Sequence, residues 1–293
     1  KPKDITRLSE KTWVGDEATF KRLFEENPRD DVGWLHRFLY LTHFSYGKLR
    51  GRSFSPPGRG VEAKTIGRIE QFAPRLKGVK IFGGDYRPIL RKYDSKDTVF
   101  FLDPPYAGYN VDVGEDAFEE AAFCELLTKL EGKFLLTYGI RGELPRLVKE
   151  AGFQIKRIRT RRSISSMRGV GGPSILTQLI VSNYTVAQKS FEALDGWEVE
   201  ETRMSTVTVP SCFDVETVEV DKAQPFGTFG GSFHYAKRLV PLLPAHNTYV
   251  EPFAGAAALL HAKEASDKEV IADLDPDVVF LHRTIKAMTE KRQ

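Results

Sequence analysis

Short apolar runs alternate with helical patterns through most of the chain after residue 78. Runs bounded by Gly, Pro or Asp are typical of strands, while apolar residues spaced three to four apart predict helices. Strands are predicted within 78–85, 98–106, 133–139, 153–163, 174–184, 248–251 and 268–273, and helices within 117–132, 142–152 and 258–263. This alternation predicts an α/β fold with a Rossmann-like three-layer sheet.

The first 78 residues have a different pattern, which is mostly helical. Residues 16–49 place apolar side chains at helical spacing, and the Gly-, Pro- and Arg-rich segment 47–60 is typical of an exposed loop or hairpin. Residues 185–224 are less regular, but their alternating part is compatible with a β-hairpin. We therefore expect four segments: 1–78, 79–184, a connector at 185–224, and 225–293.

Composition narrows the class of protein. Of the 293 residues, 41% are hydrophobic, and no run of about 18 apolar residues predicts a transmembrane helix. No secretory signal pattern opens the sequence, so the cytoplasm is the expected location. Two cysteines and six scattered histidines, without a CxxC pair, predict neither a disulfide framework nor a metal site.

Basic residues gather in two segments. Residues 48–77 hold eight Lys or Arg against two Glu, and residues 153–172 hold six without any acid. Such a local excess of positive charge is the pattern expected for binding a phosphate backbone, although two solvated faces would look the same.

A second pattern, at 248–273, indicates a nucleoside-bearing ligand. The strand 248–251 leads into a turn of small residues at 253–258, and the strand at 268–273 ends in an acid, Asp273. A turn of this kind lets a ligand approach the backbone, and an acid at the next strand end can accept hydrogen bonds from ribose hydroxyls. Residues 255–260 read GAAALL and lack the later glycines of a dinucleotide fingerprint. This favours S-adenosylmethionine, which carries no phosphate.

The strand 98–102 ends in Asp103-Pro104-Pro105-Tyr106. Proline holds the Asp103–Pro104 backbone extended, so the Asp103 carboxylate and the Pro104 carbonyl form a rigid pair of acceptors. They match the two N–H donors of an exocyclic amine, and Tyr106 offers a ring for stacking a base, worth roughly 1–3 kcal/mol. We predict methyl transfer by positioning and electrostatics, on a base flipped out of its duplex.

The three motifs together resemble those of Dam-type, alpha-class-like N6-adenine DNA methyltransferases. The resemblance rests on DPPY at 103–106, YVEPFAGAAAL at 249–259 and IADLDPDVV at 271–279, and it extends to 38–54, 82–90 and 229–244. It implies S-adenosylmethionine as cofactor, double-stranded DNA as substrate, and catalysis by Asp103, Pro104 and Tyr106. The implied cofactor residues are Glu251, Phe253, Ala254, Gly255, Asp273, Leu274, Asp85, Tyr86 and Lys237.

The expected DNA contacts combine this resemblance with the basic segments. They are Lys48, Arg50, Arg52, Ser53, Arg59, Arg161 and Arg162. On this interpretation 1–78 is a DNA-recognition subdomain, 79–184 is the catalytic half of the methyltransferase domain, and 225–293 is its cofactor-binding half. The family runs from cofactor motif through the recognition region to DPPY, whereas DPPY comes first here. We therefore expect a circular permutation, because joining the two ends of the chain restores the family order.

Other interpretations stay open at this point. N4 of cytosine, an RNA base or a glutamine amide presents a similar planar amine, although Asp103 favours adenine. A catalytically silent DNA-binding module with the same fold is the alternative from another class. A cognate restriction endonuclease is a possible partner, and the expected state is a monomer or weak dimer.

Overall fold

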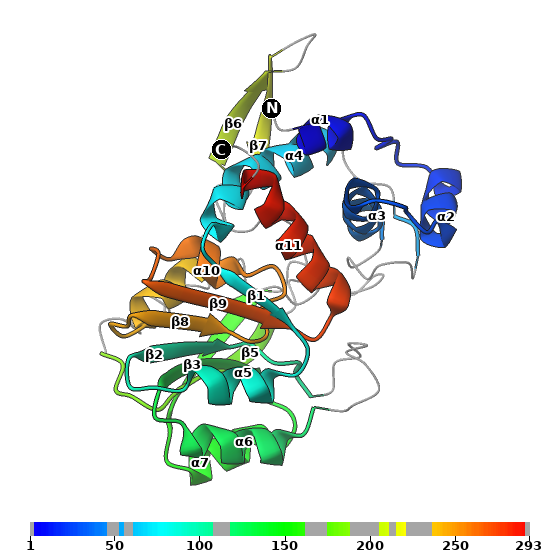
Figure 1. Cartoon of the computed structure of the whole chain (residues 1–293). Coiled ribbons are helices and arrows are strands. Elements are labelled where there is room, and N and C mark those ends of the chain that lie inside the picture. The colour runs from blue at the N-terminus through cyan, green and yellow to red at the C-terminus, as the bar shows by residue number, and fades with distance from the viewer. Residues whose placement is uncertain are drawn as a thin grey trace.

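The computed structural model describes residues 3–45, 53–55, 61–107, 118–161, 175–187, 205–210, 215–220 and 236–290. Its centre is a seven-stranded sheet in the order β1-β9-β8-β2-β3-β5-β4 (Figure 1). Neighbours from β1 to β3 are parallel, and β5 runs antiparallel to both β3 and β4. The strands are β1 (Lys80–Gly83), β2 (Thr98–Leu102), β3 (Lys133–Gly139), β4 (Gln154–Arg161), β5 (Ile175–Ser182), β8 (Thr248–Glu251) and β9 (Lys268–Asp273).

Helices cover both faces of this sheet. On β2, Val99 and Phe101 belong to one buried cluster while Phe100 and Leu102 belong to the other, as the alternation of side chains along a strand requires. The face of Phe100 is covered by α5 (Tyr86–Tyr93), α6 (Glu120–Lys129) and α7 (Leu144–Glu150). The face of Val99 is covered by α1 (Lys3–Ser9), α3 (Asp31–Phe44), α4 (Val61–Phe72), α9 (Ala236–Leu239), α10 (Ala258–Ala262) and α11 (Pro276–Glu290), with the 3-10 turns Ala73–Leu76 and Val240–Leu242.

The first and last helices of the chain share one core. Ile5 and Leu8 of α1 lie in the same buried cluster as Leu281 and Ile285 of α11, and both helices contact α3. In Figure 1 the helices α1 and α11 lie on the same side of the molecule. A smaller, separate cluster joins α2 (Glu17–Glu25) to the other side of α3.

The structure confirms the α/β sheet that the sequence predicts. The ranges of β3 and β8 coincide with the predicted strands 133–139 and 248–251. A separate antiparallel hairpin, β6 (Ser205–Pro210) and β7 (Val215–Val220), lies within the connector 185–224. The helices that the pattern did not predict individually are α1, α4, α5, α9 and α11. In α5, Pro88 interrupts the apolar pattern, yet it is tolerated because the first-turn N–H groups have no partner within a helix.

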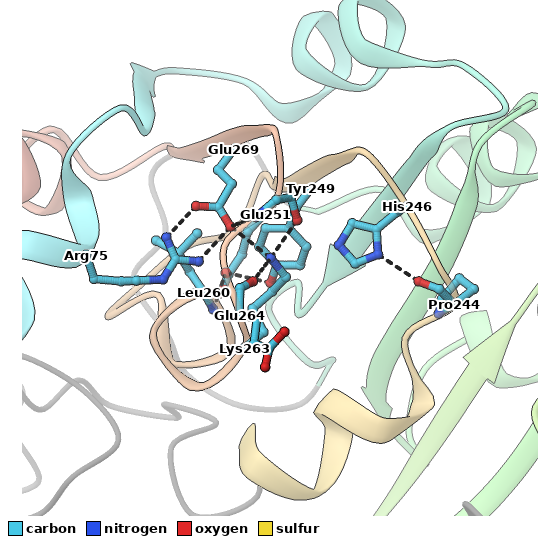
Figure 2. A network of polar contacts seen from close by, with 10 residues as sticks. Arg75, Pro244, His246, Tyr249, Glu251, Leu260, Lys263, Glu264 and Glu269 are labelled. Atoms are coloured by element: carbon cyan, nitrogen blue, oxygen red, sulfur yellow. Dashed lines mark hydrogen bonds and ion pairs between the residues drawn. The ribbon is translucent and has the colours of Figure 1, made fainter.

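A network of buried ion pairs at the amino-terminal end of β9 connects residues that are far apart in the sequence (Figure 2). Lys263 donates to Glu269 at 2.8 Å and to Ser266 Oγ at 2.8 Å, and Arg75 donates to Glu269 Oε1 at 2.6 Å. Lys263 and Glu269 are only 7% and 6% exposed. Burial alone would raise the pKa of Glu269, but the hydrogen bonds from Arg75 and Lys263 outweigh it and hold that pKa below its ordinary value. Arg75, one of the basic residues of 48–77, is therefore engaged inside the protein.

None of the helices that the structure describes is long and apolar enough to span a membrane. Among the same residues, no group of three or more His, Cys, Asp and Glu side chains lies close enough together to hold a metal ion.

Candidate active site

The predicted motifs follow the carboxyl ends of neighbouring parallel strands. β8 pairs with β2 on one side and with β9 on the other, and β9 pairs with β1. The turn after Glu251, the Asp103 motif after β2, Asp273 at the end of β9 and Asp85 after β1 therefore gather at one edge of the sheet. In open α/β sheets this edge, where the strand order reverses, is where ligands bind. The reversal lies here between β8 and β2.

The Asp103 carboxylate is held by two hydroxyl groups. Thr137 on β3 donates to its Oδ1 at 2.5 Å, and Tyr106 donates to the same atom at 3.0 Å. Asp103 is only partly buried, whereas Pro104 is buried. The acid is thus fixed in direction by its neighbours while it stays within reach of a ligand. The sequence pattern had not singled out Thr137.

Tyr106 is anchored on β3. Its ring centroid lies 5.2 Å from that of Tyr138, and the ring also packs against the backbone at Gly139. Tyr138 in turn donates to Glu120 at 2.7 Å, and burial raises its pKa above the ordinary tyrosine value. Gln178 of β5 donates to the Tyr106 hydroxyl at 3.3 Å. Neither Tyr138 nor Gln178 carries a motif signal in the sequence.

Two side chains hydrogen-bond to the backbone of the small-residue turn at Gly255. Asp273 Oδ2 accepts from the Gly255 N–H at 2.7 Å, and His282 Nε2 donates to the Gly255 carbonyl at 2.8 Å. Gly255 has a φ of 46°, in the left-handed region that glycine adopts most readily. Burial lowers the pKa of His282 to about 4, so the ring is neutral at physiological pH. His282 is a further residue that the sequence pattern missed.

Asp273 is placed as expected for an acid that binds a ribose. It is partly exposed, and its other oxygen accepts from the Asp275 N–H at 2.9 Å. Each oxygen of a carboxylate can accept more than one hydrogen bond, which is the chemistry that ribose hydroxyls require. The next residue, Leu274, lines a hollow of about 350 Å³ together with Gly83, Gly84 and Val279 among others. A carboxylate acceptor next to such a space fits the nucleoside part of S-adenosylmethionine.

Aromatic residues flank the same edge. The ring of Tyr86 lies 4.9 Å from that of Phe253, so two predicted cofactor residues are in contact. Asp85 caps α5 by accepting from the Arg87 N–H at 2.7 Å, and its carboxylate pairs with the Arg87 side chain. Leu274 is 54% exposed. Ala254, by contrast, is buried, and its N–H donates to the Ala272 carbonyl at 2.9 Å. Lys237 is exposed on the short helix α9.

Glu251 differs from the other predicted cofactor residues because it is 1% exposed. Its Oε2 accepts from the Tyr249 hydroxyl at 2.8 Å and from the Leu260 N–H at 3.3 Å. Burial, with a smaller contribution from the Asp103 charge, raises the pKa of Glu251 to about 8. In this structure Glu251 therefore stabilises the segment after the turn from the protein interior, through its hydrogen bond with the Leu260 N–H.

The raised pKa of Glu251 predicts a pH-dependent stability. Below the unfolded-state pKa near 4.5 both states hold the proton, and above about 8 both have lost it. Between these values only the unfolded state ionises, so the free energy of unfolding should fall by up to about 1.4 kcal/mol per pH unit. Urea unfolding from pH 5 to 8 measures this slope. The variant Glu251→Gln should show a shallower slope; equal slopes for both proteins would contradict this assignment.

Most of the predicted DNA contacts lie outside the described residues, namely Lys48, Arg50, Arg52, Arg59 and Arg162. Arg161 ends β4, and Ser53 is exposed. The structure does describe residues on either side of Lys48, Arg50 and Arg52. Ser45 and Phe54 form an antiparallel bridge, and the Ser55 N–H donates to the Phe44 carbonyl at 2.7 Å.

One comparison concerns protein families. Residues 229–292 match the model of the D12 class N6 adenine-specific DNA methyltransferases. Over this segment the chain is similar to that family. The matched segment contains β8, α10, β9 and α11, hence the Gly255 turn and Asp273. The match supports S-adenosylmethionine-dependent methylation of adenine in DNA as the activity. The finer placement as Dam-type stays a prediction.

Solved structures of similar fold include two methylases. The M1.HpyAVI–SAM complex is 13% identical, with a TM-score of 0.40, over 71% of the methyltransferase and 98% of that chain. A protein assigned as a DNA modification methylase from Thermus thermophilus, complexed with S-adenosyl-L-methionine, is 14% identical with a TM-score of 0.39, over 72% and 95%. Scores this low do not support residue-by-residue correspondence. The search of curated proteins gave no match.

Proposed function

We propose that the methyltransferase binds a flipped-out adenine at Asp103, Pro104 and Tyr106. The observation that carries this is the placement of Asp103 directly after β2, which pairs with β8, the strand whose carboxyl end leads into the Gly255 turn. The Asp103 carboxylate and the Pro104 carbonyl accept the two N–H groups of the exocyclic amine, which turns its lone pair toward the cofactor. S-adenosylmethionine supplies the electrophilic methyl group when bound. No strong base is needed, since fixed acceptors stabilise the positive charge that develops on the amine.

We place the cofactor between the Gly255 turn and the ends of β9 and β1. Asp273 accepts from the ribose hydroxyls, while Tyr86, Phe253 and Leu274 border the nucleoside. The exposed carboxylate of Asp85, at the end of the neighbouring strand, is the remaining acceptor on that side. Support comes from the two backbone hydrogen bonds that orient Asp273 and from the hollow beside it.

The variant Asp273→Ala should bind S-adenosylmethionine roughly tenfold to a hundredfold more weakly, because two acceptors for ribose hydroxyls are lost. Isothermal titration calorimetry measures the dissociation constant. Asp275→Ala is the matched control, since it removes an acid from the same loop whose carboxylate caps the Asp277 N–H. If both variants bind the cofactor as the parent protein does, the ribose assignment is wrong.

We also propose that the chain is a circular permutation of the usual family order. β8, β9 and β1 are adjacent strands, but β8 and β9 come last in the sequence and β1 comes first. Joining the end of α11 to the start of α1 would make the three strands follow one another in a single βαβ-like series. The shared core of α1 and α11 supports this, since both ends already pack on α3.

The DNA-binding surface that we propose is the basic segment 47–60. The bridge between Ser45 and Phe54 pairs the residues on either side of Arg50 and Arg52, and the Phe54 ring centroid lies 5.6 Å from that of Phe20. Replacing Arg50 and Arg52 together by Gln should lower the salt dependence of DNA binding by roughly two phosphate contacts, about 1.8 in the log–log slope. Titrations at several salt concentrations measure the slope. An unchanged slope would contradict this assignment and indicate the basic segment 156–168 as the DNA-binding surface.

A further inference from the structure

Gln178 is a buried amide beside the proposed catalytic group. It lies on β5 opposite Gly139 of β3, in a segment with no motif of its own, and is 3% exposed. Its Nε2 donates to the Tyr106 hydroxyl at 3.3 Å. Its Oε1 accepts no hydrogen bond from any residue that the structure describes. A buried acceptor without a hydrogen bond destabilises the folded state, so its presence at this position calls for a reason.

The reason lies in the hydrogen bonds at Asp103. Tyr106 and Thr137 both donate to Oδ1, and together they occupy the two lone pairs of that atom. An incoming amine can bind this oxygen only after one of the two hydroxyls has turned away. Thr137 has a second acceptor nearby, the Leu102 carbonyl at 3.4 Å. For the Tyr106 hydroxyl, the neighbouring acceptor is the amide of Gln178.

We infer that Gln178 is a positioning residue that accepts the Tyr106 hydroxyl when the substrate amine binds Asp103. A half-turn of the amide exchanges Nε2 and Oε1, which have nearly the same shape, and brings the acceptor to the Tyr106 oxygen. Tyr106 then donates to Gln178 Oε1 in place of Asp103, and the amine takes the vacated lone pair. The Nε2 group gives up its bond to Tyr106 and occupies the place that Oε1 had, so the amide keeps one hydrogen bond to Tyr106 in each orientation. Gln178 thereby acts through Tyr106 and has no contact with the reacting atoms. This inference rests on the proposed function of Asp103.

A double-mutant cycle tests it, with Gln178→Met, Tyr106→Phe and the double variant. Met keeps the length of Gln178 but cannot accept the hydroxyl. In the parent background, Gln178→Met should lower kcat roughly fivefold to tenfold, about the contribution of one hydrogen bond, without changing the affinity for S-adenosylmethionine. In the Tyr106→Phe background, the same change should alter kcat less than twofold. Gln154→Met on β4 is the matched control, because Gln154 bonds to Val186 and Ser182; its kcat should equal that of the parent.

The remaining outcomes are distinct. A full loss of kcat from Gln178→Met in both backgrounds, or no loss in either, overturns the role of Gln178. If Gln178→Met does not fold, Gln178→Leu takes its place, and urea unfolding of the four proteins tests whether the two changes couple. Coupling in stability without an effect on kcat also overturns the inference, because a structural role alone would explain it. If the parent protein methylates adenine but Asp103→Ala is equally active, the proposed function has failed instead.

Discussion

Replacing Asp103 by alanine is expected to lower methyl transfer at least a hundredfold while the dissociation constant for S-adenosylmethionine stays within about threefold. The loss follows because a preorganised acceptor for the amine is removed, and groups of this kind contribute about 10²–10³ in rate. The cofactor contacts that we propose come from other strand ends, so binding should survive. Single-turnover kinetics with saturating cofactor, alongside calorimetry, separate the two effects.

Asp94→Ala is the control for this experiment. Asp94 is also a partly buried acid that accepts backbone hydrogen bonds, from Gly132 at 2.8 Å and from Glu131 at 3.2 Å. It precedes β2, however, and so lies at the opposite end of the sheet from Asp103. The control variant should lose some stability and keep its kcat. If the rate of methyl transfer by Asp103→Ala is within threefold of the parent rate, Asp103 has no catalytic role.

The second large effect concerns the buried ion network. Glu269→Gln should lower the free energy of unfolding by about 3 kcal/mol, because Lys263 and Arg75 are left with no full countercharge inside the protein. The figure is at the low end for buried pairs, because the Arg75 side chain is 20% exposed and water can partly solvate it. Urea unfolding at pH 7 measures the change. Since the network lies at the amino-terminal end of β9, kcat should be unaffected wherever the variant is folded.

Glu125→Gln provides the comparison on the surface. Glu125 pairs with Lys129 one helical turn away, but the two side chains are 67% and 66% exposed. Exposed pairs of this kind contribute little to stability because water and salt screen them, so this variant should unfold almost as the parent does. Similar losses for Glu269→Gln and Glu125→Gln would show that burial of the network does not matter for stability.

The sequence predicted the sheet well because its strands are buried and bounded by glycine or by acids. VFFL at 99–102 and KFLLTYG at 133–139 have no competing helical period, and both form the strands expected. The pattern failed for α4 and α5, where charged residues and Pro88 interrupt the apolar spacing. Their apolar side chains are buried in the core clusters on the two faces of the sheet, and the local sequence does not encode this packing.

For the site, sequence patterns found the residues that follow strand ends and missed those that support them. Asp103, Asp273 and Asp85 are visible because an acid at the end of an apolar run is unusual. Thr137, Gln178 and His282 sit within a strand or helix, and only the fold brings them to the same place. For Glu251 the sequence motif predicts a ligand contact, whereas in the structure its side chain is buried.

The most direct measurement identifies the methylated base. Genomic DNA would be incubated with the purified protein and S-adenosylmethionine carrying an isotope-labelled methyl group, then digested to nucleosides and separated by chromatography with mass detection. The label should appear in N6-methyladenine with the parent protein and be absent with Asp103→Ala. Label in N4-methylcytosine, or no label in DNA with a folded parent protein that binds the cofactor, would contradict the assignment of this site to adenine methylation.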